Sequence, residues 1–212
     1  MVWKLHKILI ISLFSNDANA EETCERCLEE ALKLSPTSFD ALMQISNLRI
    51  LRRRDEEALA HMERIYSIVL QCINQNDETN LPSQDLLQNL SKNFAELAQY
   101  VKAIKILDVL IKLDDEDLEC WYLLAFNHYT IKNFKHAAKC LKHFKRVSAK
   151  VSHKTNQVLE LEEAAAELEV TIEEIRKTCV DGELTNNNLE DTEDNEEERM
   201  MNNSNVDDMN ID

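Results

Sequence analysis

The sequence predicts an all-α protein in which helical hairpins stack one on another. The 212 residues include only one Gly and two Pro, which are too few for the turns that sheets need. Leu, Ala, Glu and Lys, all good helix formers, are frequent. A pattern of large and small apolar residues also returns along the chain at a fixed interval. Together these observations indicate a repeat protein built from helix pairs.

The clearest helix pair lies between residues 118 and 149. A polar residue, Asn133, separates two segments in which apolar residues recur at helical spacing. A small residue on each segment, Ala125 and Ala137, would let the two backbones approach closely. The apolar positions of the pair are Trp121, Leu124 and Ala125, followed by Ala137, Leu141 and Phe144. This arrangement is typical of the tetratricopeptide repeat (TPR), whose period is about 34 residues.

Further copies are found in register. Copies begin at Leu118, at Gln84 and at Phe39, and a partial copy begins at Leu5 and ends near Leu28 and Ala31. The two middle copies are 45 residues apart, which is 11 more than the 34-residue period, and the loop at 74–83 accommodates the difference. The matching apolar positions are Leu87, Leu90, Ser91, Phe94, Ala103, Leu107 and Leu110, and Leu42, Ile45, Ser46, Ala58, Met62 and Ile65. We therefore expect a right-handed TPR superhelix over 21–150.

The expected helices follow from the same pattern. A capping helix within 151–179 should cover the last hairpin with Leu159, Leu161, Leu168 and Ile172 and keep that end soluble. The expected ranges are 21–34, 39–51, 55–73, 83–99, 100–113, 114–131, 133–149 and 156–178.

The two terminal segments differ from the repeats. In 1–20, two lysines, an apolar run at 8–14 and Ala-Asn-Ala at 18–20 resemble a secretory signal peptide. We favour the alternative, a packed first helix of a partial repeat, and expect further repeats before it. Residues 181–212 carry twelve acids and one Arg, which is −11 of the net charge of −16. We predict a disordered acidic tail over 180–212, which either keeps the chain soluble or competes with nucleic acid for a basic partner.

No enzyme, metal or cofactor signature is found. The sequence lacks a Gly-rich phosphate loop, a Gly-x-Ser-x-Gly elbow and a His-Glu-x-x-His pair. Six scattered cysteines form no disulfide framework, and Cys24-x-x-Cys27 has no second pair at zinc-site spacing. We expect no catalytic residue, no cofactor and no metal, and a reducing compartment.

Function is therefore expected on the concave surface formed by the first helices of the TPR pairs. Acids recur there, and the last copy adds aromatic rings, which suits a segment rich in Arg and Lys. The predicted protein-binding residues are Asp40, Met43, Asn47, Asp85, Gln88, Glu96, Glu119, Tyr122, Phe126 and Tyr129. An alternative is that Tyr122 and Phe126 contact the capping helix instead.

A second charged surface is predicted on the last hairpin. From Lys132 to Lys154 there are seven Lys and one Arg without an acid. We expect Lys135, Lys139, Lys142 and Lys145 to line the outer side of a helix. Three readings stay open: a solvated face, a nucleic-acid contact, or a place where the acidic tail binds. We expect no direct nucleic-acid binding, no small-molecule substrate and no membrane partner.

Several segments are similar to a known family. They are ETCERCLEEALKLSPTSFDALMQISNLRILRRRDEEA, LPSQDLLQNLSKNFAELAQYVKAIKILDVLIKLDDEDLECWYLLAF and the acidic tail. Over about 21–145 the chain resembles the TPR assembly chaperones of ribosomal protein uL4. Its most specific features are Leu-Arg-Ile at 48–50 before an Arg-rich turn, Leu-Pro-Ser at 81–83, and the segment from Asp114 to Phe126.

The resemblance implies a function. Such chaperones capture newly made uL4 in the cytoplasm, accompany it into the nucleus and shield its basic loop until it joins the pre-60S particle. The resemblance does not identify which residues of this chain would bind the client. The alternatives are a TPR adaptor in another complex, or a secreted protein if 1–20 is a signal peptide.

Overall fold

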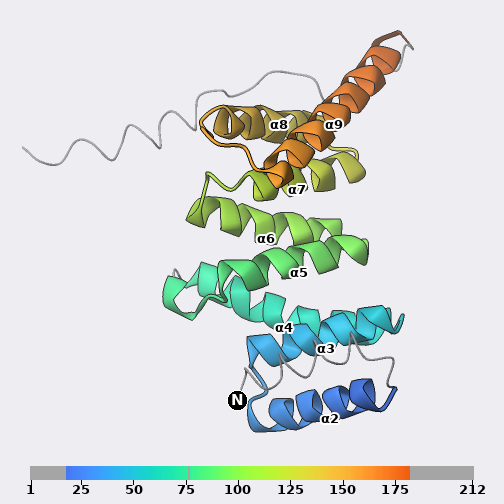
Figure 1. The fold of residues 1–212 in the computed structure, drawn as a ribbon, viewed down its shortest axis with the longest axis vertical. Coiled ribbons are helices and arrows are strands. Elements are labelled where there is room, and N and C mark those ends of the chain that lie inside the picture. Colours follow the sequence, from blue (N-terminus) through green and yellow to red (C-terminus); the bar gives the residue numbers. More distant parts are fainter. Residues whose placement is uncertain (1–17, 76, 182–212) are drawn as a thin grey trace, which may run out of the picture. The chain divides into compact units, whose positions relative to one another are not determined.

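The computed structural model describes residues 18–75 and 77–181, and over these residues it contains helices joined by turns and loops and no strand (Figure 1). The expectations for 1–17 and for the tail at 182–212 lie outside the described residues. The helices are α2 (Ala18–Leu34), α3 (Phe39–Leu51), α4 (Asp55–Asn74), η1 (Glu78–Asn80), α5 (Gln84–Glu96), α6 (Tyr100–Leu113), α7 (Leu118–Thr130), α8 (Phe134–Ser148) and α9 (Asn156–Asp181).

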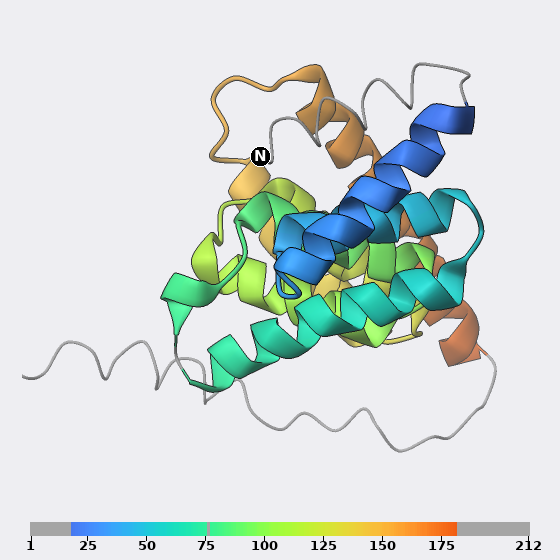
Figure 2. The same ribbon diagram turned by 90° about the horizontal axis from the view of Figure 1, so that it is seen from below.

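Consecutive helices pair into hairpins. α3 packs on α4, α5 on α6 and α7 on α8, and α2 packs on α3. The chain divides into two compact units, Met1–Ile172 and Glu173–Asp212, and every hairpin belongs to the first. Within that unit the helices follow one another in chain order, and Figure 2 views the stack from below. The all-α TPR-type architecture is therefore as predicted.

The predicted repeat register is confirmed by burial. The alanine at the same position of each second helix, Ala58, Ala103 and Ala137, is fully buried, and these small side chains let the paired backbones approach. The other apolar positions assigned to the three complete copies are buried too, except at Trp121. That indole is half-buried, donates a hydrogen bond from Nε1 to the Asp115 carbonyl at 2.8 Å, and stacks on His143.

Polar N-caps decide where the first helices begin. The Ser83 hydroxyl accepts a hydrogen bond from the Leu86 amide at 3.4 Å, so α5 starts at Gln84 rather than at residue 83. The Asp117 carboxylate accepts from the Glu119 amide at 2.8 Å, so α7 starts at Leu118 rather than at 114. The predicted ranges were thus too long at these ends.

The turn inside each complete hairpin has a left-handed residue. Arg53, Ala98 and Lys132 have φ of 58°, 56° and 62°, and they occupy the same position in their three copies. This conformation costs a residue with a Cβ about 1 to 2 kcal/mol compared with a right-handed one. The scarcity of Gly was therefore no obstacle to tight turns between helices.

The core is one apolar cluster from α3 to α9, with a smaller cluster between α2 and α3. Ala165, Leu168 and Ile172 of α9 are buried in the larger cluster. Leu159 is 49% exposed, so its predicted place on the last hairpin is wrong. Its helical neighbour Leu161 lies half-buried against the core instead.

Neither a membrane-spanning helix nor a metal-binding cluster appears in the described part of the chain. None of its helices is long and apolar enough to cross a bilayer. No three His, Cys, Asp or Glu side chains gather there as a metal site would require. Cys24, Cys27, Cys72, Cys120 and Cys140 are free thiols.

Candidate protein-binding surface

The predicted binding residues lie on α3, α5 and α7, the first helices of the three hairpins. Lys92 lies between Gln88 and Glu96 on α5, and we call the predicted residues together with Lys92 the first-helix surface: Asp40, Met43, Asn47, Asp85, Gln88, Lys92, Glu96, Glu119, Tyr122, Phe126 and Tyr129. α5 contacts both α3 and α7, so the set spans three neighbouring hairpins.

Polar contacts join these helices. The Asn93 amide donates a hydrogen bond to Asn47 Oδ1 at 2.6 Å, which links α5 to α3. Gln88 Nε2 donates to Glu119 Oε2 at 3.1 Å, and Lys92 Nζ lies 2.7 Å from Glu119 Oε1, which link α5 to α7. Two of the predicted binding residues, Gln88 and Glu119, therefore meet across neighbouring hairpins.

The acids of the surface fall into two kinds. Asp40, Asp85 and Glu96 are exposed, and no ion pair within the described residues involves them. Glu119 is half-buried, and Lys92 and Gln88 occupy both of its carboxylate oxygens. The anionic character is therefore strongest at the three exposed acids and is locally neutralised at Glu119.

The aromatic residues of the first-helix surface differ in how far they are exposed. Tyr122 and Phe126 stack with ring centroids 6.5 Å apart, and Phe126 is 41% exposed. Burial, followed by the nearby Glu167 carboxylate of α9, raises the pKa of the Tyr122 hydroxyl. Glu167 is near enough to act on Tyr122 electrostatically, and contact between the two rings and the capping helix stays a prediction. Tyr129 packs on Phe134 at 5.9 Å and is half-buried.

Met43 was predicted to line the binding surface, and this prediction is wrong. Its side chain is only 3% exposed and belongs to the main core. It therefore cannot line an open surface, although Asn47, one helical turn later, is half-buried within reach of solvent. The mistake arose because the repeat position indicates the side of the helix and not the depth at which a neighbouring helix covers it.

The α8 helix carries the predicted basic face. Lys135, Lys139 and Lys142 are exposed and take part in no ion pair within the described residues. Lys145 was assigned to the same face, but it points toward α9 and pairs with Glu169 at 2.5 Å. The basic face is thus one residue narrower than predicted.

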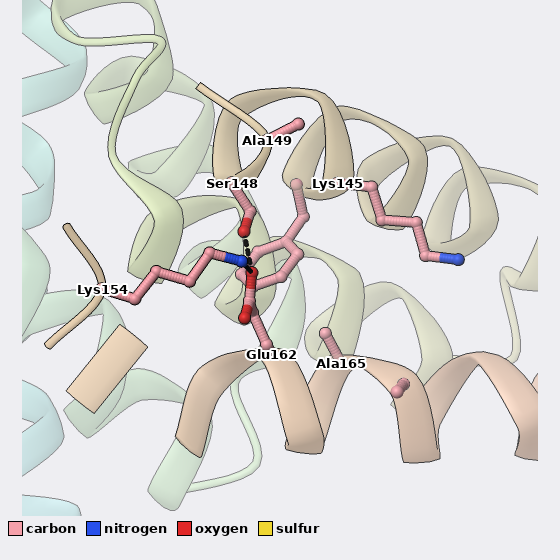
Figure 3. Close-up of a pocket in the computed structure, with 8 residues that line it drawn as sticks. Lys145, Ser148, Ala149, Lys154, Glu162 and Ala165 are labelled. Carbon is pink, nitrogen blue, oxygen red and sulfur yellow. Dashed lines mark hydrogen bonds and ion pairs between the residues drawn. The ribbon is translucent and has the colours of Figure 1, made fainter. Parts of the chain in front are cut away.

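A small cavity lies where α9 meets α8 (Figure 3). Its volume is about 280 Å³, and Phe144, Ala149 and Ala165 supply apolar walls. Glu162 accepts hydrogen bonds from Lys154 and Ser148 across it, and these bonds lower the pKa of its carboxyl. Both bonds end on Oε1 of Glu162, so these three polar side chains are joined to one another across the cavity between α8 and α9.

Sequence reasoning missed a buried arginine. The side chain of Arg49 on α3 is surrounded by Glu25 and Glu29 of α2 and by Glu57 of α4. Its Nε lies 3.1 Å from Glu57 Oε2 without hydrogen-bond geometry. The Arg-rich turn at 52–54 was a sign of a charge cluster in this region. It could not show that carboxylates from α2 and α4 both meet Arg49.

The fold is confirmed by solved structures. A tetratricopeptide repeat protein from Parabacteroides merdae ATCC 43184 aligns with a TM-score of 0.56 and 16% identity, covering 82% of this chain and 60% of its own. MamA from Desulfovibrio magneticus RS-1 aligns with a TM-score of 0.51 and 12% identity, covering 84% of this chain and 96% of its own. The chain has a TPR fold. At these identities the likeness concerns the fold alone.

Two curated proteins match the sequence itself. Both are named "Probable assembly chaperone of rpl4". The protein from Emericella nidulans is 30% identical over 111 residues, which is 52% of this chain and 28% of that protein. The protein from Schizosaccharomyces pombe is 29% identical over 124 residues, which is 57% of this chain and 37% of that protein. The matches thus cover little more than a third of these relatives at most. No protein-family model matches the chain.

Proposed function

We propose that this chain is a non-enzymatic TPR chaperone that binds a basic segment of newly made uL4. Its similarity to two proteins named "Probable assembly chaperone of rpl4" supports the choice of client, and the TPR fold supports a protein-binding role. In this proposal the chain captures uL4 in the cytoplasm and accompanies it to the pre-60S particle in the nucleus.

The observation that carries the proposal is the chemistry of the first-helix surface. Asp85 and Glu96 stand exposed on α5, and the exposed ring of Phe126 follows on α7. Carboxylates attract ammonium and guanidinium groups, and an aromatic face adds a cation–π contact. A segment dense in Lys and Arg would therefore find several partners on neighbouring helices.

A chaperone also has to keep a basic client from other polyanions. The acids of 181–212 raise the net negative charge of the chain to −16. Such a charge draws a basic client by long-range attraction and repels RNA. This charge supports a chaperone for a ribosomal protein better than it supports an RNA-binding role.

The test is capture during translation. The full chain, carrying an affinity tag, is purified from cells, and the associated messenger RNA and nascent chains are identified. We expect enrichment of uL4 over other ribosomal proteins. A stable stoichiometric complex with another partner, without nascent uL4, would instead identify a TPR adaptor and contradict the proposal.

A further inference from the structure

One carboxylate of the first-helix surface is already bound in the free protein. Lys92 Nζ lies 2.7 Å from Glu119 Oε1, and Gln88 Nε2 donates to Glu119 Oε2 at 3.1 Å. Lys92 and Gln88 both come from α5, whereas Glu119 lies in the first turn of α7. The side chains of Lys92 and Glu119 are 38% and 28% exposed, so solvent and a ligand can both reach the pair.

Two aromatic rings follow Glu119 on α7, and with its carboxylate they offer the charge and the ring faces that bind a single cation. Tyr122 and Phe126 follow Glu119 by about one and two helical turns, and their rings stack on each other. Phe126 is largely open, while Tyr122 is partly covered. A carboxylate followed by aromatic faces binds an ammonium or guanidinium group through charge and cation–π contacts together.

We propose that Glu119 is the binding position for one Arg or Lys side chain of the bound polypeptide, and that Lys92 occupies this position in the free protein. The inference rests on the proposed function, because it names one contact of the same surface. On binding, the partner's cation replaces Lys92 at Glu119, and Lys92 turns into solvent. Lys92 is thus an internal competitor that lowers affinity for basic segments.

The exchange favours arginine over lysine. A guanidinium can donate to both carboxylate oxygens in one plane, so it replaces Gln88 as well as Lys92. It also stacks on aromatic rings, and Phe126 is the exposed ring nearest in the helical register. An ammonium replaces only the contact that Lys92 already makes.

The chain offers a matched control for the loss of one positive charge. Lys102 of α6 pairs with Glu63 of α4, outside the first-helix surface, and its side chain is 30% exposed. Replacing either lysine by methionine changes the net charge equally and leaves an unbranched side chain that is one atom shorter. Only the Lys92 substitution frees a carboxylate of the proposed binding position.

The experiment measures binding of the full chain to a dye-labelled 12-residue peptide of alternating Arg and Ser by fluorescence anisotropy in about 0.1 M salt. We expect Lys92→Met to tighten binding about fivefold and Lys102→Met to change it less than twofold. In a Glu119→Gln background, Lys92→Met should give no gain. A Lys-Ser peptide should gain less than the Arg-Ser peptide.

The outcomes separate this inference from the proposed function. If the wild-type chain captures uL4 but Lys92→Met behaves like Lys102→Met, the competitor role is wrong and the chaperone role stands. If neither the wild-type chain nor Lys92→Met binds the peptide or uL4, both are wrong. A gain that persists in the Glu119→Gln background contradicts the assignment of Glu119.

Discussion

The junction of α2 with the first hairpin and the junction of α9 with the last hairpin are held by different forces. At the first, the apolar contact is small, comprising Cys24, Leu28, Ala41 and Ile45, and charged side chains complete it. At the second, Ala165, Leu168 and Ile172 join the main core, and the ion pairs of Lys145 and Lys154 lie at the edge.

The difference shows what each junction should be sensitive to. Arg49 is only 4% exposed, and burial, followed by Arg54, lowers its pKa, although Glu57 opposes this. Removing one partner of a buried charge cluster leaves the others uncompensated, whereas an edge ion pair is worth little. The first junction should therefore respond to charge changes and the last to changes of side-chain volume.

The largest expected effect is at Arg49. Arg49→Met should destabilise the first junction by about 3 kcal/mol, since Glu25 then loses its most buried partner. Urea denaturation gives the free energy of unfolding, and hydrogen exchange should show α2 amides losing protection first. As a control, Arg54→Met, which removes a more exposed partner of Glu25, should cost less than about 1 kcal/mol. Equal effects of the two substitutions would refute the distinction between buried and edge charges.

The next effect is on the apolar face of α9. Leu168→Ala should destabilise the last junction by about 2 to 3 kcal/mol, because it leaves a cavity among buried side chains. Leu159→Ala removes the same atoms from an exposed position and should change stability by less than about 0.5 kcal/mol. Urea denaturation of both variants compares them directly, and a large loss at Leu159 would place the wrong face of α9 on the core.

Histidine titration offers a smaller and more local comparison. Burial lowers the pKa of His61 near the first junction, with Arg64 and Arg49 adding to the shift and Glu57 and Glu29 opposing it. Burial, followed by His136, lowers the pKa of His128 on the last hairpin. Because each folded-state pKa lies below the unfolded value of about 6.5, stability is full above that pH and falls as the pH drops below it.

The test uses NMR titration of the two imidazoles. In Arg49→Met the pKa of His61 should rise toward its ordinary value, while the pKa of His128 should not change. A shift at His128, or none at His61, would contradict the assignment of the charge cluster to the first junction.

The smallest effect concerns a turn between the two junctions. Ala98 has φ of 56°, a left-handed conformation that costs a residue with a Cβ about 1 to 2 kcal/mol and that glycine adopts without this cost. Glycine also raises the conformational entropy of the unfolded chain, which lowers stability by about 1 kcal/mol. Ala98→Gly should therefore stabilise the middle hairpin by about 0.5 kcal/mol in urea denaturation. A loss of stability would mean that the turn is not strained.

The sequence predicted the repeats better than the surroundings of single side chains. Leu87, Leu90 and Phe94 could be assigned to the core because the copies repeat in register and each helix buries one face. Leu159 was misplaced because α9 lies outside the 34-residue period, and its apolar residues alone allow two faces. The Lys92–Glu119 pair could not be foreseen, since a repeat position does not say which charges of neighbouring copies meet.

The central claim is that the first-helix surface binds the basic client. The most direct test is the affinity of the full chain for purified uL4, measured by isothermal titration calorimetry for two matched variants. Asp85→Lys combined with Glu96→Lys reverses exposed acids of this surface, and Lys135→Glu combined with Lys139→Glu reverses exposed cations of α8. We predict that the first pair weakens binding at least about tenfold and that the second changes it less than about twofold. Unchanged affinity in the first variant, or an equal loss in the second, would contradict the account.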